Sequence, residues 1–408
     1  MARHPELLIP AASLEVLKTA VIFGADAVYI GGESFGLRAK AKNFSVQDMK
    51  EGIAFAHARH VKVYVTANIF AHNRDLEGVR AYFEELKALK PDGLIIADPG
   101  VFDIAGEVCP EIERHISTQA NNTNYAACRF WHRQGASRVV AARELSLEEI
   151  KELRRNIPAR MEIEAFIHGS MCISYSGRCL LSNYFTGRDA NQGSCTHPCR
   201  WKYAVVEETR PGEYMPVYEN DRGTYIFNSK DLCMIGHIPE LIDAGIDSLK
   251  VEGRMKTALY VAAVARTYRK ALDDYQENPG KYRANMPWYL EQIAGCTYRQ
   301  FTTGFFFGKP DGNTQIYNES TYVKEYTYLG TVEEERDGLC RIEQKNKFSV
   351  GEWIEVMKPD GRNVKVRVGR ITDEDGTEQM SAPHARQIIF VDLQGQAEKY
   401  DILRRAEV

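Results

Sequence analysis

Four of the nine cysteines fall within 28 residues, and this cluster is the feature of the sequence that most directly suggests chemistry. The four are Cys172, Cys179, Cys195 and Cys199, with the spacing C-x6-C-x15-C-x3-C. Structural zinc sites favour paired cysteines about two to four residues apart, and only the second pair here is close. An iron–sulfur cluster needs four thiolates but no fixed pairing. The spacing therefore favours an iron–sulfur cluster and leaves zinc or unligated thiols as alternatives.

Positive charge gathers around these cysteines. Between His168 and Tyr203 the local charge is +3, whereas the whole chain has 52 basic and 56 acidic residues and a net charge of −4. The charged residues of the segment are Arg178, Arg188, Arg200 and Lys202 against Asp189. Such a segment suits an anionic cluster, a phosphate backbone or a carboxylate substrate. A solvated loop with ordinary surface arginines is the alternative.

The length and composition are those of a folded protein with two or three domains, or with one large α/β domain and an appendage. The chain has 408 residues, of which 44% are hydrophobic and 26% charged, so it can bury a full core. Nine cysteines are too few for a secreted disulfide scaffold. No apolar run approaches the roughly 18 residues that span a bilayer, and the first residues lack the apolar core of a signal peptide. We therefore expect a cytoplasmic protein with no membrane contact.

Short apolar runs alternate with amphipathic helical stretches over the first 270 or so residues, which is typical of a parallel sheet covered by helices. The pattern predicts a (β/α)8 TIM-like barrel over residues 1–275. An open doubly wound sheet is the alternative, but the first strand is not followed by G-x-G-x-x-G. The expected strands are Leu7–Pro10, Ala27–Ile30, Lys62–Thr66, Leu94–Ala97, His115–Thr118, Arg138–Ala142, Glu162–Ile167 and Ser248–Glu252.

Two segments depart from the barrel pattern. Residues 168–236 form an insertion after the seventh expected strand and carry the cysteine cluster, which places it at the end of the barrel where active sites lie. Residues 276–321 form a connector, and residues 322–408 predict a small C-terminal all-β barrel domain. Its expected strands are Tyr328–Val332, Leu339–Ile342, Trp353–Val356, Val364–Ile371 and Ile388–Val391.

The C-terminal domain has no basic character by composition. From Lys324 onward it contains 14 basic and 17 acidic residues. Any contact of this domain with a polyanion must therefore depend on a local patch. The candidates are Arg362, Lys365, Arg367 and Arg370, and a solvated face of an edge strand is the alternative.

Several long motifs resemble those of the collagenase-like peptidase family of unassigned catalytic type, and the resemblance covers nearly the whole chain. The motifs are EAFIHGSMC at 164–172, SGRC at 176–179, LS at 181–182, CTHPCRW at 195–201, NSKDL at 228–232 and KVEGR at 250–254. Within that family the chain is most similar to the prephenate-dependent tRNA uridine hydroxylases. Other members hydroxylate a ribosomal RNA cytidine, or the ring of a quinone precursor without oxygen.

The resemblance implies an enzyme that converts the wobble uridine of tRNA to 5-hydroxyuridine with prephenate as oxygen donor. It also implies a [4Fe-4S] cluster held by the four cysteines, which aerobic preparations can lose or replace with zinc. The two-part layout favours an RNA over a quinone precursor as substrate. The other hypotheses are a collagenase-like peptidase and a non-catalytic, zinc-stabilised RNA-binding protein.

Residues at the ends of the expected strands are the candidates for the active site. Arginine forks suit the two carboxylates of prephenate, so we expect Arg143 and Arg254 to bind it, with Arg178 in reserve and Gln119 lining the pocket. His168 is the expected proton donor, with a hydrogen-bonded structural histidine as the alternative. Glu252 is the expected base; the alternative is a salt-bridge set with Lys250 and Arg254. The run Phe305–Phe307 is expected as a buried connector rather than a base-stacking surface.

Overall fold

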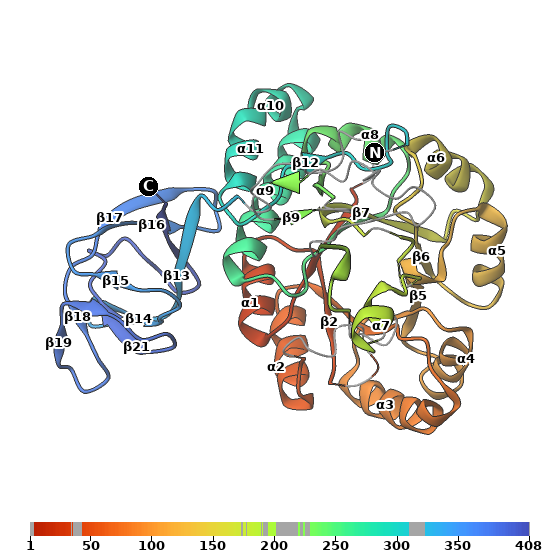
Figure 1. The fold of residues 1–408 in the computed structure, drawn as a ribbon, viewed down its shortest axis with the longest axis horizontal. Helices are drawn as coiled ribbons and strands as arrows, with labels where there is room; N and C mark the ends of the chain where they lie inside the picture. Colours follow the sequence, from red (N-terminus) through yellow and green to blue (C-terminus); the bar gives the residue numbers. More distant parts are fainter. Residues whose placement is uncertain are drawn as a thin grey trace, which may run out of the picture. The chain divides into compact units, whose positions relative to one another are not determined.

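The fold is described from a computed structural model of the chain, which forms two compact units (Figure 1). The structure describes residues 4–33, 35, 43–172, 174–176, 178–188, 190, 195–200, 219–220, 223–224, 229–309 and 323–407. The first unit contains residues 1–14, 26–255 and 299–322, and the second contains residues 15–25, 256–298 and 323–408.

Eight parallel strands close into a barrel in the first unit, which confirms the predicted TIM-like fold. Neighbouring strands pair in chain order from β1 to β7, and β11 closes the ring by pairing with both β1 and β7. Every expected strand is present, because each apolar run is buried on both sides. The strands are β1 (Glu6–Pro10), β2 (Ala27–Gly31), β3 (Lys62–Ala67), β4 (Gly93–Ile96), β5 (Glu113–Ile116), β6 (Arg138–Val140), β7 (Glu162–Ser170) and β11 (Ser248–Val251).

Helices alternate with these strands and surround them (Figure 1). Those of the first unit are α2 (Val46–His57), α3 (Leu76–Leu89), α4 (Pro99–Val108), α5 (Tyr125–Arg133), α6 (Leu147–Asn156) and α8 (Ile238–Asp243). Helix α6 begins at a capping box in which Ser146 and Glu149 satisfy each other's backbone N–H groups. None of the helices in the described ranges is long and apolar enough to cross a membrane.

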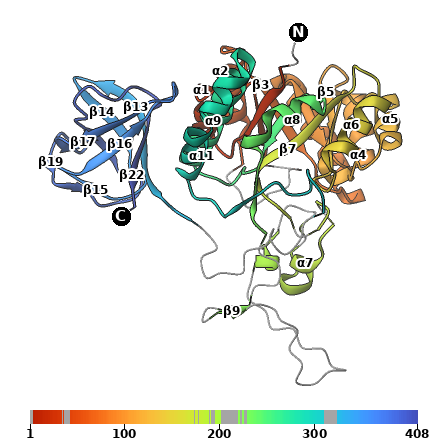
Figure 2. The ribbon, with the colours of Figure 1, turned by 90° about the horizontal axis from the view of Figure 1, so that it is seen from above.

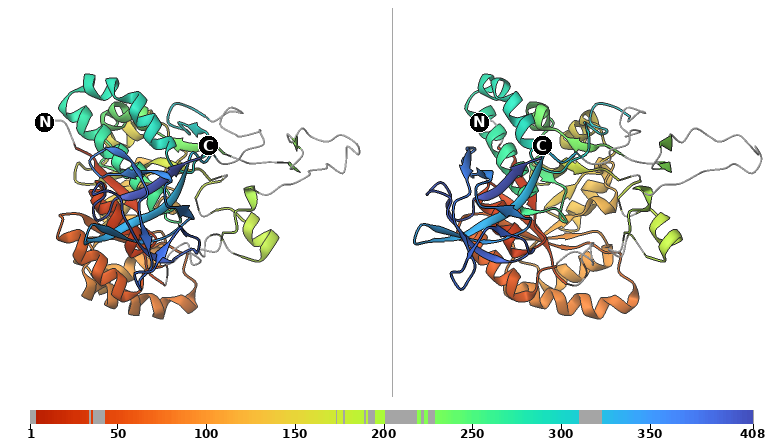
Figure 3. Two further views of the ribbon diagram at one scale, coloured as in Figure 1. Left: turned by 90° about the vertical axis from the view of Figure 1, so that its left-hand side faces the viewer. Right: turned by 60° about the vertical axis from the view of Figure 1, so that its left-hand side comes forward.

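The insertion leaves the carboxyl end of β7 and returns to it. It includes α7 (Leu181–Thr186), the 3-10 turn η4 (Pro198–Arg200), the short strands β8 (Glu219–Asn220) and β9 (Gly223–Thr224), and β10 (Asp231–Cys233). Strand β10 runs antiparallel to the end of β7 and parallel to β12 (Phe301–Thr302). Figures 2 and 3 show α7 outside the ring of barrel helices. The insertion is thereby rooted at the carboxyl ends of the barrel strands.

The second unit combines helices with an antiparallel sheet. Its helices are α1 (Leu14–Ile22), of which all but the first residue belong here, α9 (Ala258–Glu277), α10 (Pro279–Ala284) and α11 (Met286–Ala294), the last two lying in the expected connector. The sheet has the order β17-β16-β22-β13-β14-β21-β18-β19. Its strands are β13 (Tyr326–Arg336), β14 (Leu339–Glu343), β16 (Trp353–Met357), β17 (Asn363–Arg367), β18 (Ile371–Thr372), β19 (Glu378–Gln379), β21 (Ile388–Val391) and β22 (Ile402–Ala406); β15 (Phe348–Ser349) and β20 (Ser381–Ala382) pair separately.

The C-terminal all-β prediction is confirmed, with differences in individual strands. The expected strand Val364–Ile371 is divided into β17 and β18, and the strands β15, β19, β20 and β22 were not expected. The sheet encloses its own apolar core, which includes Leu329, Val356 and Val391. The buried Arg266 of α9 joins the sheet to the helices of this unit by donating to the carbonyl of Lys358 at 2.8 Å.

A network of buried charges connects four strands inside the barrel. The guanidinium of Arg138 on β6 lies 2.7 Å from Glu6 on β1 and 3.1 Å from Glu164 on β7. The second carboxylate oxygen of Glu164 accepts from the ammonium group of Lys250 on β11 at 2.6 Å. The side chains of Arg138, Glu164 and Lys250 are almost completely buried. Because buried charges are costly unless paired, these contacts fix the relative positions of the strands.

The network keeps its carboxyl groups ionised. Burial alone would raise the pKa of the Glu164 carboxyl, but the charges of Lys250 and Arg138 outweigh it and hold that pKa below its ordinary value. The Glu6 carboxyl has a lowered pKa for the same reason, with Arg138 as the dominant partner. Burial, together with the charge of Arg138, lowers the pKa of the completely buried His115.

Replacing Arg138 with methionine is expected to destabilise the protein by about 3–5 kcal/mol, because Glu6 would lose its cation while largely buried and Glu164 would keep only Lys250. Denaturant or thermal unfolding of the variant and the parent protein measures this. The matched control is Arg80→Met, which breaks an exposed ion pair of 2.6 Å with Glu107 and should cost at most about 1 kcal/mol. Similar losses in the two variants would contradict the importance of the buried network.

The free energy of unfolding of the parent protein and of Arg138→Met, measured over a range of pH, gives a second test of the network. Since Glu6 and Glu164 have folded-state pKa values below the ordinary 4.5, their contribution is complete above that value and is lost as the pH falls through the lowered folded-state values. The acid loss of stability should therefore be steeper in the parent protein than in Arg138→Met. Parallel curves would contradict this assignment.

Candidate active site at the carboxyl end of the barrel

The predicted site residues lie at or beyond the carboxyl ends of the barrel strands. Gln119 is in the 3-10 helix η2 (Thr118–Ala120) after β5, Arg143 follows β6, His168 is near the end of β7, and Glu252 follows β11. Active sites of TIM barrels lie at this end, where each strand delivers the residues that follow it. The barrel therefore brings together residues that are more than 100 positions apart in sequence.

Arg143 and Glu252 form an ion pair across the ends of three neighbouring strands. One guanidinium nitrogen of Arg143 lies 3.0 Å from the Glu252 carboxylate, and another donates to the carbonyl of Ser170 at 3.3 Å. The guanidinium carbon stands 4.0 Å from the centre of the Phe166 ring. Both side chains of the pair are largely buried. Glu252 is thus in a position to orient Arg143, a role that differs from the base expected from the sequence.

The close approach of Glu252 to the end of β7 requires a glycine at position 169. Gly169 has φ +104, and a Cβ at that position would lie 2.4 Å from the backbone oxygen of Glu252. The backbone N–H of Glu252 also donates to the carbonyl of His168 at 2.8 Å. A side chain at Gly169 would push Glu252 away from Arg143, which explains why glycine is needed in the EAFIHGSMC motif.

Arg254 occupies a separate position near the ends of β2 and β3. It is 5% exposed and donates to the Thr66 hydroxyl at 2.8 Å. Gly31 leaves room for it, since a Cβ there would lie 2.4 Å from the guanidinium. Lys250, Glu252 and Arg254 have partners on or just after three other strands, namely Glu164, Arg143 and Thr66, respectively.

Three buried side-chain atoms in the residues that follow β5 and β6 have no hydrogen-bond partner among the described residues. They are Nδ2 of Asn121, Oδ1 of Asn122 and Nε of Arg143. Asn122 is 1% exposed and pairs with Ala141 through a β-bridge. Buried polar atoms usually have partners, so these three indicate a place for water or a polar ligand. The sequence analysis did not single out Asn122, although it lies in the polar run that follows β5.

His168 and Gln119 are both buried. His168 is 2% exposed and lies in register with Val251 of β11 and Cys233 of β10, and its ring centre is 5.8 Å from that of Phe301. The carbonyl oxygen of the Gln119 side chain accepts from the Ser117 hydroxyl at 3.3 Å. Their expected roles in proton donation and pocket lining remain predictions.

Arg178 attaches the stretch that carries the four cysteines, residues 172–199 and hereafter the cysteine segment, to the carboxyl end of the barrel. Its Nε donates to the side-chain oxygen of Asn121 at 2.7 Å, and its guanidinium carbon lies 5.0 Å from the Phe70 ring centre. Arg178 is adjacent to Cys179, so these contacts hold that cysteine near the ends of β3 and β5. The side chain expected as a reserve carboxylate ligand thus also anchors the segment.

A buried hydroxyl joins the two halves of the cysteine segment. The Ser182 hydroxyl of α7 accepts from the backbone N–H of Thr196 at 3.0 Å, and Ser182 is completely buried. The Thr186 hydroxyl lies 3.3 Å from the Thr196 hydroxyl. Thr196 follows Cys195, and α7 begins soon after Cys179. These contacts bring the segments that carry the first and second cysteine pairs together.

Four cysteine thiols are the ligands that an iron–sulfur cluster requires. In the described structure, however, these four thiols do not lie close together. All nine cysteines are described and are thiols rather than disulfides; Cys172 is exposed, Cys179, Cys195 and Cys199 are half-buried, and the other five are buried. No group of three or more His, Cys, Asp or Glu side chains in the described ranges is close enough to hold a metal.

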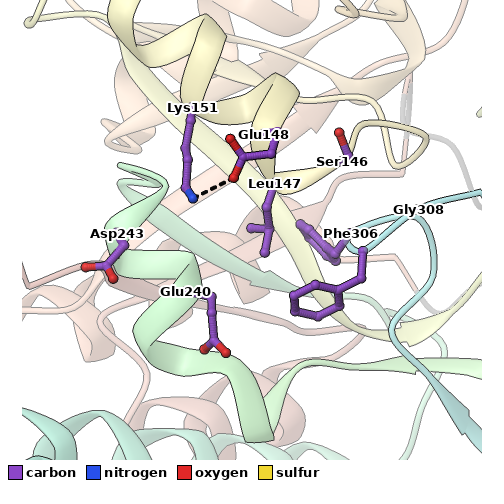
Figure 4. A pocket seen from close by; sticks show the side chains of 9 residues that line it. Ser146, Leu147, Glu148, Lys151, Glu240, Asp243, Phe306 and Gly308 are labelled. Carbon is purple, nitrogen blue, oxygen red and sulfur yellow. Dashed lines mark hydrogen bonds and ion pairs between the residues drawn. The ribbon is translucent and has the colours of Figure 1, made fainter.

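A pocket of about 360 Å³ lies elsewhere on the first unit, outside the barrel. It lies beside the start of α6, helix α8 and residues 306–308 (Figure 4). Phe306 is buried there and its carbonyl accepts from the backbone of Leu147 at 3.0 Å, whereas Phe307 is exposed. The run Phe305–Phe307 is therefore a connector that is only partly buried. The pocket is lined by more acidic than basic side chains, and none of the predicted site residues lines it.

Comparison with known proteins agrees with the motifs. Residues 12–316 match the model of peptidase family U32, and residues 324–404 match its C-terminal domain. The chain is 40% identical over 409 residues to tRNA hydroxylation protein P1 of Bacillus subtilis, covering 100% of this chain and 96% of that protein. It is 38% identical over 423 residues to tRNA hydroxylation protein P of Escherichia coli, with 93% and 91% covered.

A more distant relative acts on another RNA. The chain is 37% identical over 322 residues to a 23S rRNA 5-hydroxycytidine synthase of Escherichia coli, covering 78% of this chain and 47% of that protein. The family models and the full-length relatives cover both units. The chain belongs to peptidase family U32.

Proposed function

We propose that this protein hydroxylates the wobble uridine of tRNA to 5-hydroxyuridine, with prephenate as oxygen donor. The observation that carries the proposal is the full-length similarity to two proteins named for tRNA hydroxylation. The site supports it as well, since a cationic segment with accessible thiols is anchored over the carboxyl end of a barrel by Arg178.

Arg143 and Arg254 are suited to bind a dicarboxylate. Both guanidiniums are largely buried, so a carboxylate there would be bound with little competition from water. Glu252 positions Arg143 through the 3.0 Å ion pair, and the Phe166 ring supports the guanidinium from one face. In this proposal Gln119 lines the pocket, and His168, whose carbonyl is bonded to Glu252, remains the candidate proton donor.

Cys172, Cys179, Cys195 and Cys199 are the proposed ligands of a [4Fe-4S] cluster. When bound, such a cluster supplies one-electron transfer. The chain's own contribution is to keep Cys172 exposed, to join the two segments through Ser182, and to hold the cationic Arg178 next to Cys179 in sequence.

A related reaction on another RNA is the second candidate, because of the similarity to a ribosomal RNA 5-hydroxycytidine synthase. The peptidase function in the family's name has less support. A Cys172–His168 dyad would pair an exposed thiol with an imidazole that is 2% exposed and packed against Phe301. It would also remove one cysteine from the four-thiol set.

Nucleoside analysis of tRNA tests the function directly. In cells that lack this protein and its homologues, expression of the parent chain should restore 5-hydroxyuridine in tRNA, and Cys195→Ala should not. The matched control is Cys128→Ala, which removes a buried thiol of α5 outside the segment and should retain the modification. Hydroxycytidine in ribosomal RNA without 5-hydroxyuridine in tRNA would favour the second candidate. Restoration by Cys195→Ala would contradict the role of the cysteines.

Ser182→Ala tests the connection between the two cysteine pairs. Loss of the hydroxyl removes the acceptor for Thr196, so we expect anaerobically purified protein to lose iron to a chelator about tenfold faster, the effect of roughly 1.4 kcal/mol for one buried hydrogen bond. Ser174→Ala is the control, since that hydroxyl bonds only to the adjacent Tyr175 within the described segment. Equal rates of iron release would contradict the role assigned to Ser182.

A further inference from the structure

One edge of the sheet in the second unit presents a tryptophan and two cations to solvent. Strand β17 is an end strand of the sheet and pairs with β16, with Trp353 opposite Arg367 and Glu355 opposite Lys365. Side chains alternate along a strand, so these four share one face. The intervening residues on the other face lie in the apolar core; they are Ile354, Val356 and Val366.

Contacts within the second unit cover only one end of this face. Asn363, at the start of β17, donates to the side chain of Gln292 on α11 at 2.9 Å. At the other end, Trp353 is 66% exposed, and Lys365 and Arg367 are exposed. Within the described ranges, no aromatic ring or cation stacks on Trp353. The exposed part of the indole is therefore available to stack on a flat or cationic group of a ligand.

The charges near Trp353 leave the face electropositive. Glu355 accepts from Arg404 at 2.6 Å, and Glu352 is paired with Arg405 at 2.7 Å, so both carboxylates are already compensated. Lys365 forms no ion pair or side-chain hydrogen bond with any described residue. Arg367 uses Nε to donate to the carbonyl of Gly351 at 3.1 Å, which leaves its terminal nitrogens for a ligand.

We propose that Trp353, Lys365 and Arg367 form an RNA-binding surface, in which the indole stacks on a nucleobase and the two cations contact phosphates. The inference rests on the proposed action on tRNA and adds the surface that holds the substrate. Aromatic residues beside cations are the usual means of binding unpaired nucleotides. Cations on an edge strand also prevent sheet-to-sheet pairing, but an exposed tryptophan has no such effect. The face is a local patch in a region with more acidic than basic residues.

Binding of bulk tRNA to the full-length protein tests this surface. Trp353→Ala should raise the Kd about fivefold or more, the effect of losing one base–aromatic stack, and Trp353→Phe should keep most of the affinity. Lys365→Gln/Arg367→Gln should reduce the slope of log affinity against log salt by about 1.4 to 1.8, because two phosphate contacts are lost.

Matched controls lie in the same region of the chain. Met380→Ala removes an apolar side chain that is 77% exposed, and Arg336→Gln/Lys347→Gln removes two exposed cations. Both should leave the Kd and the salt slope unchanged. An effect of these controls as large as that of the test variants would overturn the assignment to this face.

The assay separates this proposal from the proposed function because it does not require hydroxylation. An unchanged Kd in Trp353→Ala and in the Lys365/Arg367 variant overturns the RNA-binding surface, even if the parent protein hydroxylates tRNA; the face would then suit a protein partner. Weaker binding by the test variants supports the surface, even if no hydroxylation of tRNA is found.

Discussion

The charge network around Arg138 is the interaction on which the rest of the barrel depends. One guanidinium contacts carboxylates from β1 and β7, and Glu164 extends the network to Lys250 on β11. These strands include the point where the ring closes. A shift of one strand past its neighbour would separate these buried charges, a cost added to that of displacing apolar side chains. The network therefore fixes the register of the strands that carry the candidate site.

Contacts lead from this network to the barrel end. The ammonium group of Lys250 lies 5.4 Å from the centre of the Phe166 ring, and the guanidinium of Arg143 lies 4.0 Å from the same ring. Phe166 thus connects the charge network with the Arg143–Glu252 pair. Beyond that pair, Asn121 and Arg178 attach the cysteine segment to the strand ends. Each step uses a partner from a different strand, so the site depends on the barrel being closed.

The sequence predicted the fold better than the roles of individual side chains. Every barrel strand was predicted because its apolar run is buried on both sides. Strand β22 was missed, since ILRRA contains two arginines; one is buried against the Tyr326 ring 4.1 Å away, a contact that only the folded sheet creates. Lys250, Glu252 and Arg254 alternate along the chain and looked like one salt-bridge set, but each has a partner on a different strand. These contacts join residues that are far apart in sequence, so the local pattern of residue types cannot predict them.

The central proposal is that Cys172, Cys179, Cys195 and Cys199 bind an iron–sulfur cluster in a protein that hydroxylates RNA. The most direct measurement is the visible absorption spectrum of anaerobically purified protein, with iron, sulfide and zinc counted per chain. The account predicts a broad band near about 400 nm with about four iron and four sulfide per chain. One tightly bound zinc without sulfide would contradict it and would favour a structural or hydrolytic metal site.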